Sequence, residues 1–168
     1  MKNIILVGFM GTGKTVVAQE LARRLKREYV SLDELIEERE KRPITKIFAE
    51  SGENYFRDVE SQVVKEISDR ENLVIDAGGG VVIREENVKN LKKNGVLICL
   101  KASPEVIFKR TKNYTHRPLL NVTQPLERIK ELLKIREPYY ACADYFIDTS
   151  EVSISEVVEK ILEIVKNK

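Results

Sequence analysis

The sequence predicts one three-layer α/β domain built on a parallel sheet. Short apolar runs alternate with amphipathic helical patterns along the chain, and two of the runs end directly in glycine-rich loops. A length of 168 residues, with 42% hydrophobic and 33% charged residues, is typical of one globular domain that buries its own core. Strands that alternate with helices favour parallel pairing and right-handed crossovers. Because ligands of such sheets gather at the carboxyl ends of the strands, the site residues are expected there.

The first half of the chain contains two strands, each followed by helix. An apolar run at 4–7 leads into a glycine loop, and the helix after the loop carries apolar residues at helical spacing: Val17, Ala18, Leu21, Ala22 and Leu25. A second strand is expected at about 29–32, and Asp33 is a candidate N-cap for the next helix, which ends near Pro43. Residues 51–52 indicate a turn. Beyond that turn a helix is predicted by the spacing of Phe56, Val59, Val63, Val64 and Ile67.

The second half of the chain continues the alternation. Apolar runs predict three more strands, at 73–75, 96–100 and 145–147. Three helix starts are indicated, at Ser103-Pro104-Glu105, at about Leu126 for a helix to Ala143, and after Ser153, where Glu156 completes the spacing of a capping box. Periodicity disappears from Lys112 to Pro125, so the segment 112–124 is predicted to be a lid loop.

The segment 8–15 carries the full phosphate-binding pattern Gly8-Phe9-Met10-Gly11-Thr12-Gly13-Lys14-Thr15, called the P-loop below. It follows a strand and precedes a helix, as the pattern requires. Glycines let the backbone turn its N–H groups toward phosphate oxygens, and the helix N-terminus adds its positive dipole end. The motif predicts an enzyme that binds ATP with Mg²⁺ and transfers the γ-phosphoryl group. Lys14 is expected to reach the transferred phosphate and Thr15 to ligate Mg²⁺; the nucleotide contacts are expected at Gly11, Thr12, Gly13, Lys14, Thr15 and Val16.

Several other polar residues have both a functional and an ordinary interpretation. Asp33 follows a strand at the P-loop edge of the sheet, where it can accept a hydrogen bond from an acceptor hydroxyl or cap a helix. Glu53, Phe56, Arg57 and Glu60 share one helix face, which suits a pocket floor or a solvated ladder of ion pairs. Gly78, Gly79 and Gly80 after the third strand either offer bare backbone to a ligand or form a flexible turn. Arg117 in the lid and Arg136 late in a helix are either functional residues or ordinary surface arginines.

Taken in order, these motifs resemble those of the shikimate kinase family, P-loop enzymes that phosphorylate the 3-hydroxyl of shikimate. The resemblance covers nearly the whole chain and implies one P-loop kinase domain over 1–168, with a substrate-binding segment at about 33–60 and a lid at about 112–124. It rests on the P-loop, Asp33, Gly52-Glu53 with Phe56-Arg57 and Glu60, Gly78-Gly79-Gly80, Arg110, Arg117-Pro118-Leu119-Leu120, and Arg136 with Pro138-Tyr139.

The resemblance also implies a role for each matching residue. Asp33 would contact the acceptor hydroxyl, Arg57 and Arg136 would hold the shikimate carboxylate, and the triple glycine at 78–80 would approach the ring hydroxyls. Arg110 would pack on adenine, and Arg117 would join the phosphates when the lid closes. Lys14, Asp33 and Arg117 are therefore the expected catalytic residues. Paired guanidinium groups suit a planar carboxylate because each binds it through two hydrogen bonds.

Two positions depart from the family pattern. A second aspartate that helps hold Mg²⁺ usually stands two positions before Asp33, and this chain has Ser31 there. The sequence Tyr140-Ala141-Cys142-Ala143 stands where a basic residue is common, a difference expected to matter little for the chemistry. Asp76 ends an apolar strand in the manner of metal-binding aspartates of P-loop proteins. We therefore expect Asp76 to supply the missing carboxylate, although it can also simply cap the glycine turn.

Composition excludes several classes of protein. Lys and Arg exceed Asp and Glu by only two, which disfavours a nucleic-acid binder, and no apolar run approaches the 20 residues of a membrane span. Two cysteines without metal-ligand spacing suggest reduced thiols in the cytoplasm, and a monomer is expected. The expected partners are ATP or ADP and shikimate. The alternatives are another small-metabolite kinase, acting on gluconate or a nucleoside monophosphate, and a nucleotide-binding regulatory module that has lost catalysis.

Overall fold

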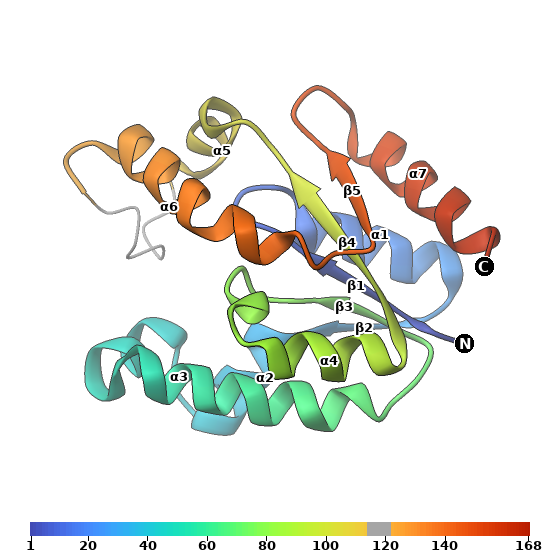
Figure 1. The fold of residues 1–168 in the computed structure, drawn as a ribbon, viewed down its shortest axis with the longest axis horizontal. Coiled ribbons are helices and arrows are strands. Elements are labelled where there is room, and N and C mark those ends of the chain that lie inside the picture. The colour runs from blue at the N-terminus through green and yellow to red at the C-terminus, as the bar shows by residue number, and fades with distance from the viewer. Residues whose placement is uncertain (114–121) are drawn as a thin grey trace.

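The computed structural model describes residues 1–113 and 122–168 and contains a five-stranded parallel sheet in the order β2-β3-β1-β4-β5 (Figure 1). The strands are β1 (Asn3–Val7), β2 (Glu28–Ser31), β3 (Leu73–Asp76), β4 (Gly95–Lys101) and β5 (Tyr145–Asp148). All four strand pairs are parallel, so every connection must cross back over the sheet. The carboxyl ends of the strands therefore share one edge, and the P-loop follows the central strand β1 at that edge.

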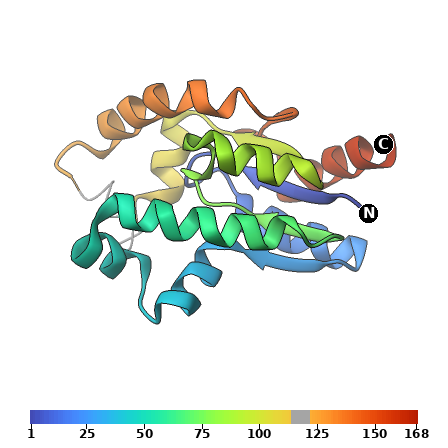
Figure 2. The ribbon, with the colours of Figure 1, turned by 60° about the horizontal axis from the view of Figure 1, so that its bottom comes forward.

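Helices follow each strand and supply the crossovers. They are α1 (Lys14–Leu25), α2 (Leu32–Glu40), α3 (Ile44–Ser68), the short 3₁₀ helix η1 (Val81–Ile83), α4 (Glu85–Lys93), α5 (Pro104–Thr111), α6 (Pro125–Tyr140) and α7 (Ile154–Lys166). Among the described residues, no helix is both long and apolar enough to cross a bilayer. Both termini lie at one end of the molecule, away from the start of α6 (Figures 1 and 2).

Alternating side chains of the buried strands divide the core between the two faces of the sheet. On β1, Ile4 and Leu6 pack with apolar residues of α1 and α7, whereas Ile5 and Val7 pack with residues of α2, α3, α4 and α6. This follows from the two-residue period of a strand, which sends neighbouring side chains to opposite faces. Helices on both faces of a parallel sheet confirm the predicted three-layer α/β fold (Figure 2).

Every end of the five strands lies within one residue of the expected end, but one local expectation was wrong and one helix was not expected. Asp33 is not the N-cap of α2, because Ser31 holds that position and its Oγ accepts a hydrogen bond from the Glu34 N–H at 3.3 Å. Asp33 lies in the first turn instead. The helix α4 was missed, because most of its nine residues are polar or charged and only Asn87 and Leu91 are buried. A helix with so few apolar residues carries almost no periodic signal.

The helix α3 is broken at Gly52, which has φ 84° and ψ 170°. This left-handed backbone region is open to glycine at little cost, and it confirms the turn expected there. The break separates Ile44–Ser51 from the longer part of α3 that carries Phe56 and Arg57. The two parts therefore run in different directions, and both contribute side chains to the cavity described below.

Candidate active site

The P-loop wraps around the N-terminus of α1. Gly13 is the N-cap of this helix and has φ 97°, so a side chain there would strain the backbone. The Lys14 Nζ donates to the backbone oxygens of Gly8 and Phe9, at 2.7 and 3.0 Å, which holds the ammonium group over the loop. The first helical N–H groups, at Thr15 and Val16, have no intrahelical acceptor and form an anion-binding end. The loop is therefore built to receive phosphate oxygens.

Thr15 and Asp76 bring two hard oxygen donors together beside the P-loop. The Thr15 Oγ1 donates to Asp76 Oδ2 at 2.6 Å, and the Tyr29 hydroxyl donates to the same oxygen at 3.3 Å. Burial, assisted by the nearby Asp76 charge, raises the pKa of Tyr29 to about 12, so the phenol stays a donor. Ser31 is the register partner of Asp76 on the neighbouring strand. Hydroxyl and carboxylate oxygens are the ligands that Mg²⁺ prefers.

A cavity of about 580 Å³ lies beside the P-loop, and residues from six helices and strands line it, together with loop residues. Asp33 enters from α2, Arg57 from α3 and Arg136 from α6, while the triple glycine at 78–80 follows β3. The aromatic rings of Phe48 and Phe56 and the side chains of Met10 and Ile44 add apolar wall. This arrangement brings the predicted acceptor-site residues together, and it supports the pocket interpretation of the Arg57 helix face over the solvated ladder.

Arg57 and Glu60 form a buried ion pair at the floor of this cavity. Arg57 Nη1 lies 2.9 Å from Glu60 Oε1, and the residues are 8% and 1% exposed. Burial raises the pKa of Glu60, against the opposing charge of Arg57, and the negative charge of Asp33 adds to the rise. Glu60 Oε2 has no hydrogen-bond partner among the residues that the structure describes. The cavity therefore presents guanidinium and carboxyl groups that are only partly satisfied by each other.

The triple glycine lets the backbone approach these charged groups closely. A Cβ on Gly80 would lie 2.3 Å from Arg57 Nη2, and one on Gly78 would lie 3.0 Å from Asp33 Oδ1. The Tyr140 hydroxyl fixes this turn by donating to the Gly79 oxygen at 2.5 Å, and burial raises the pKa of Tyr140. The stretch 140–143, which was expected to matter little, thus begins with a buried donor to the triple-glycine turn.

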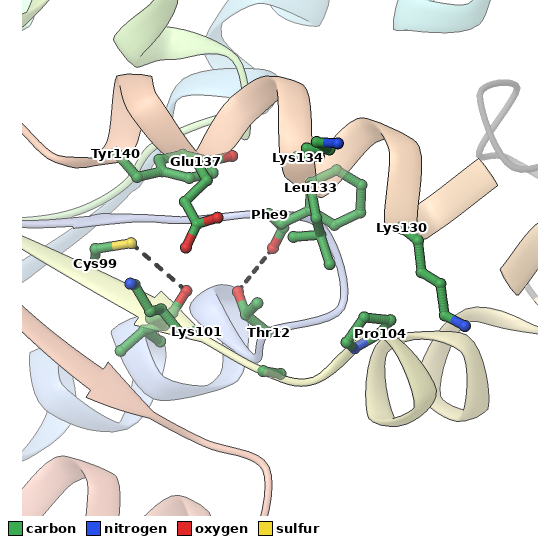
Figure 3. A pocket seen from close by; sticks show the side chains of 12 residues that line it. Phe9, Thr12, Cys99, Lys101, Pro104, Lys130, Leu133, Lys134, Glu137 and Tyr140 are labelled. Atoms are coloured by element: carbon green, nitrogen blue, oxygen red, sulfur yellow. Dashed lines mark hydrogen bonds between the residues drawn. The ribbon is translucent and has the colours of Figure 1, made fainter. Parts of the chain in front are cut away.

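A second cavity, of about 330 Å³, lies behind the P-loop between β4 and α6 (Figure 3). Phe9, Thr12, Cys99 and Tyr140 contribute to its walls, and the Thr12 hydroxyl donates to the Phe9 oxygen at 2.7 Å. None of Asp33, Arg57 and Arg136 lines it. The larger cavity is therefore the better acceptor site.

Arg110 lies at the end of α5 with its guanidinium edge on the P-loop. Its Nη1 donates to the Gly11 oxygen at 3.1 Å and to Thr149 Oγ1 at 3.0 Å, and its Nη2 donates to the Thr149 oxygen at 2.7 Å. Arg110 is thus brought to the nucleotide side of the molecule. Arg117 and most of the expected lid, at 114–121, lie outside the described residues.

The shikimate kinase family model matches residues 10–166 of the chain. The chain belongs to the shikimate kinase family. A shikimate kinase family member from Thermodesulfovibrio yellowstonii is 52% identical over 96% of this chain and 94% of its own length, and one from Pelotomaculum thermopropionicum is 49% identical over 99% and 96%. The structure of shikimate kinase from Acinetobacter baumannii in complex with shikimate superposes with a TM-score of 0.94 at 39% identity, covering 100% of this chain and 95% of the other.

Three residues of this shikimate kinase family member were not singled out by the sequence for the contacts they make. Tyr29 contacts Asp76, Tyr140 contacts the triple glycine, and Thr149 contacts the P-loop. A tyrosine at the start of a strand or the end of a helix is an ordinary core residue by its pattern alone. The only available signal was for Thr149, a polar residue placed where a strand leaves the sheet at its ligand-binding edge.

Proposed function

We propose that this chain transfers the γ-phosphoryl group of ATP to the 3-hydroxyl of shikimate, giving 3-phosphoshikimate and ADP. The observation that carries the proposal is the cavity that joins Asp33, Arg57 and Arg136 beside a P-loop, in a member of the shikimate kinase family. A carboxylate-bearing acceptor suits the two arginines, and the relative from Acinetobacter baumannii was solved with shikimate.

Each side of the cavity has a distinct task in this proposal. Arg57 and Arg136 bind the shikimate carboxylate through charge-assisted hydrogen bonds. The backbone of Gly78, Gly79 and Gly80 lies along the ring hydroxyls, since no side chain stands between them and the cavity. Asp33 accepts a hydrogen bond from the 3-hydroxyl and orients its oxygen toward the γ-phosphate. The acceptor is thereby positioned before the reaction, which is where most catalysis of phosphoryl transfer originates.

The P-loop binds the other substrate. Backbone N–H groups of Gly11, Thr12, Gly13, Thr15 and Val16 receive phosphate oxygens, and Lys14 neutralises the charge of the transferred group. The face of the Arg110 guanidinium packs on adenine, since its edge nitrogens are already bonded to the P-loop and Thr149. Arg117 joins the phosphates from the lid at about 112–124, and the segment at about 33–60 holds shikimate, all within one domain over 1–168.

The residues beside the P-loop fit Mg²⁺. We propose Thr15 and Asp76 as its protein ligands, directly or through water, because their oxygens lie 2.6 Å apart beside the P-loop. No group of three or more His, Cys, Asp or Glu side chains in the described part of the chain could hold a metal alone, so phosphate oxygens would complete the coordination. When bound, Mg²⁺ neutralises charge on the phosphates.

In this proposal Asp76 supplies the carboxylate that an aspartate at position 31 would otherwise provide. Asp76→Ala should raise the Mg²⁺ concentration needed for half-maximal activity and lower kcat, whereas Ser31→Ala should change neither. Mn²⁺ binding in the presence of ADP, followed by electron paramagnetic resonance, should weaken in parallel. Ser31→Asp in the Asp76→Ala background should recover part of the loss. Unchanged Mn²⁺ affinity and kcat in Asp76→Ala would reject the assignment.

A coupled assay of ADP release, run with several acceptors, tests the function. ATP- and Mg²⁺-dependent release should require shikimate and should not occur with gluconate or a nucleoside monophosphate. Turnover of gluconate or a nucleotide without shikimate would favour a different metabolite kinase. Nucleotide binding without any turnover would favour a regulatory module.

We further propose that the protein acts as a monomer in the cytoplasm, without nucleic acid or membrane as a partner. Cys99 and Cys142 form no disulfide, which suits a reducing compartment. Light scattering coupled to gel filtration should give the mass of one chain, 19.3 kDa. A mass of two chains would overturn the monomer.

A further inference from the structure

Thr149 is a buried residue directly after β5 that none of the roles above uses. It is 4% exposed, and its Oγ1 lies 2.8 Å from the Thr12 oxygen and 3.1 Å from the Lys101 oxygen. A hydroxyl has one hydrogen to donate, and the shorter distance assigns it to Thr12. The Thr149 N–H donates to the Lys101 oxygen at 2.8 Å, which ties the residue to the end of β4. Thr149 thus connects the P-loop to the sheet.

Arg110 completes the same cluster from the end of α5. It donates to Thr149 Oγ1 and to the Thr149 oxygen, and it also donates to the Gly11 oxygen at 3.1 Å. The hydroxyl of Thr149 therefore accepts from Arg110 while it donates to Thr12. Two successive P-loop carbonyls, at Gly11 and Thr12, are thus held by Arg110 at the end of α5 and by Thr149 directly after β5.

Because the peptide bond is planar, a contact that fixes a carbonyl oxygen also fixes the direction of the N–H group of the next residue. In a trans peptide unit the C=O and the N–H of the next residue point in opposite directions. Holding the Gly11 oxygen therefore directs the Thr12 N–H away from the cluster, and holding the Thr12 oxygen does the same for the Gly13 N–H. These two N–H groups belong to the P-loop, where phosphate oxygens are expected to bind.

Thr12 itself is fixed from a further direction. Thr12 is 1% exposed, and its hydroxyl donates to the Phe9 oxygen at 2.7 Å (Figure 3). This bond holds the side chain in place and restricts the backbone to which it is attached. Gly13, by contrast, has the left-handed φ of 97° and no atom within 4 Å of where a Cβ would lie. The orientation of the Gly13 N–H therefore depends on the Thr12 carbonyl, and that carbonyl is bonded to Thr149.

We propose that Thr149 is a positioning residue for the phosphates of ATP: it aligns the P-loop N–H of Gly13 directly and, by holding Arg110, that of Thr12. This rests on the proposed function, because it assumes that the P-loop binds nucleotide phosphates. Without the Thr149 hydroxyl, the Thr12 carbonyl loses a buried donor and the peptide unit is free to rotate toward another one. Binding of phosphate then has to reorder the loop, which weakens affinity.

Thr149→Val tests the proposal, because valine keeps the shape and removes the hydroxyl. Calorimetry should show ADP and inorganic tripolyphosphate binding about five- to tenfold more weakly to this variant, by similar factors for both. Thr149→Ser, which retains the hydroxyl, should bind both within about twofold of the parent. Shikimate affinity without nucleotide should stay unchanged in both variants. In turnover assays the KM for ATP should rise in Thr149→Val and be restored in Thr149→Ser.

Thr111→Val is the matched control. Thr111 is also a buried threonine beside the P-loop, with its methyl group against Gly11, but its hydroxyl donates to Ile107 within α5. This variant should bind tripolyphosphate normally. Thr149→Ala provides a second hydroxyl-free variant if Thr149→Val does not fold.

Four results would overturn the proposal: unchanged tripolyphosphate affinity in the hydroxyl-free variant, a loss restricted to ADP, an equal loss in Thr149→Ser, or a parallel loss of shikimate affinity. A loss restricted to ADP would place the effect at adenosine. Because these measurements need no turnover, absence of shikimate kinase activity would count against the proposed function alone. Absence of tripolyphosphate binding in the parent would count against both.

Discussion

Gly80→Ala should damage shikimate binding while leaving the nucleotide site intact. The added Cβ would lie 2.3 Å from Arg57 Nη2, 2.5 Å from Nη1 and 2.6 Å from Cζ. The backbone itself would accept alanine, since Gly80 has φ −103°. Ordinary contact begins at 3.4 Å, so the Arg57 guanidinium would have to move by about 3.4 minus 2.3, or 1.1 Å. The substitution therefore acts on Arg57 rather than on the turn.

The expected loss follows from the bonds that Arg57 would no longer make. A hydrogen bond between charged groups is worth roughly 1.5–3 kcal/mol, so displacing the guanidinium should weaken shikimate binding about ten- to hundredfold. ADP affinity should stay within about twofold, because the Gly80 Cβ meets only Arg57 at its three shortest distances. Retained ADP binding also shows that the variant is folded.

Calorimetric titration of parent and variant with shikimate and with ADP measures both quantities. Gly79→Ala adds the same methyl group one residue earlier, where the nearest atom, the Gly8 oxygen, lies 3.4 Å away. Its effect on shikimate affinity should be clearly smaller. Parental shikimate affinity in Gly80→Ala would refute the reasoning, and so would an equal loss of ADP affinity.

Three further predictions concern single groups. Asp33→Asn should lower kcat by about 10²-fold or more with ADP affinity unchanged; a parental kcat would remove Asp33 from the reaction. Burial raises the pKa of Glu60 above its ordinary 4.5, so the folded protein retains a proton that the unfolded chain releases, and stability should fall as pH rises through the raised value. Urea unfolding at several pH values should show the free energy of unfolding falling by at most ~1.4 kcal/mol per pH unit, and by less in Glu60→Gln. The same pH dependence in parent and variant would contradict this prediction. Burial raises the pKa of Cys99 to about 11, so peptide mass spectrometry should find Cys142 alkylated before Cys99 in folded protein, and the reverse order would be inconsistent with this burial.

The strands and the P-loop could be predicted from the sequence because each depends on neighbouring residues. Apolar runs of three to five residues suffice for buried parallel strands, and a fixed spacing of glycines identifies the P-loop. The N-cap of α2 was assigned wrongly because Ser31 and Asp33 are both good capping residues and the strand end was expected one residue later. Element boundaries depend on hydrogen bonds that the pattern does not contain.

Contacts between distant segments could not be predicted in the same way. Helical spacing places Arg57 and Glu60 on one face of α3, yet it does not say that Gly80 and Arg136 lie opposite that face. Only the resemblance to a known family joined these residues before the structure did. The bond from Thr149 to Thr12 spans 137 residues of chain and depends on β5 pairing with β4. No local pattern carries that information.

The register of β2 and β3 bears on how metal sites in such proteins are recognised. Ser31 and Asp76 are paired across the ladder, so their side chains leave the sheet on the same face and about one interstrand spacing apart, roughly 4.8 Å. An acid moved from one position to the other stays near Thr15, although the two positions are far apart along the chain. A sequence motif that requires aspartate two residues before Asp33 would not match this chain. A structural motif that requires only a carboxylate near Thr15 would accept one from either β2 or β3. Site motifs at the edge of a parallel sheet are therefore better defined by the positions of side chains in space than by their order in the sequence.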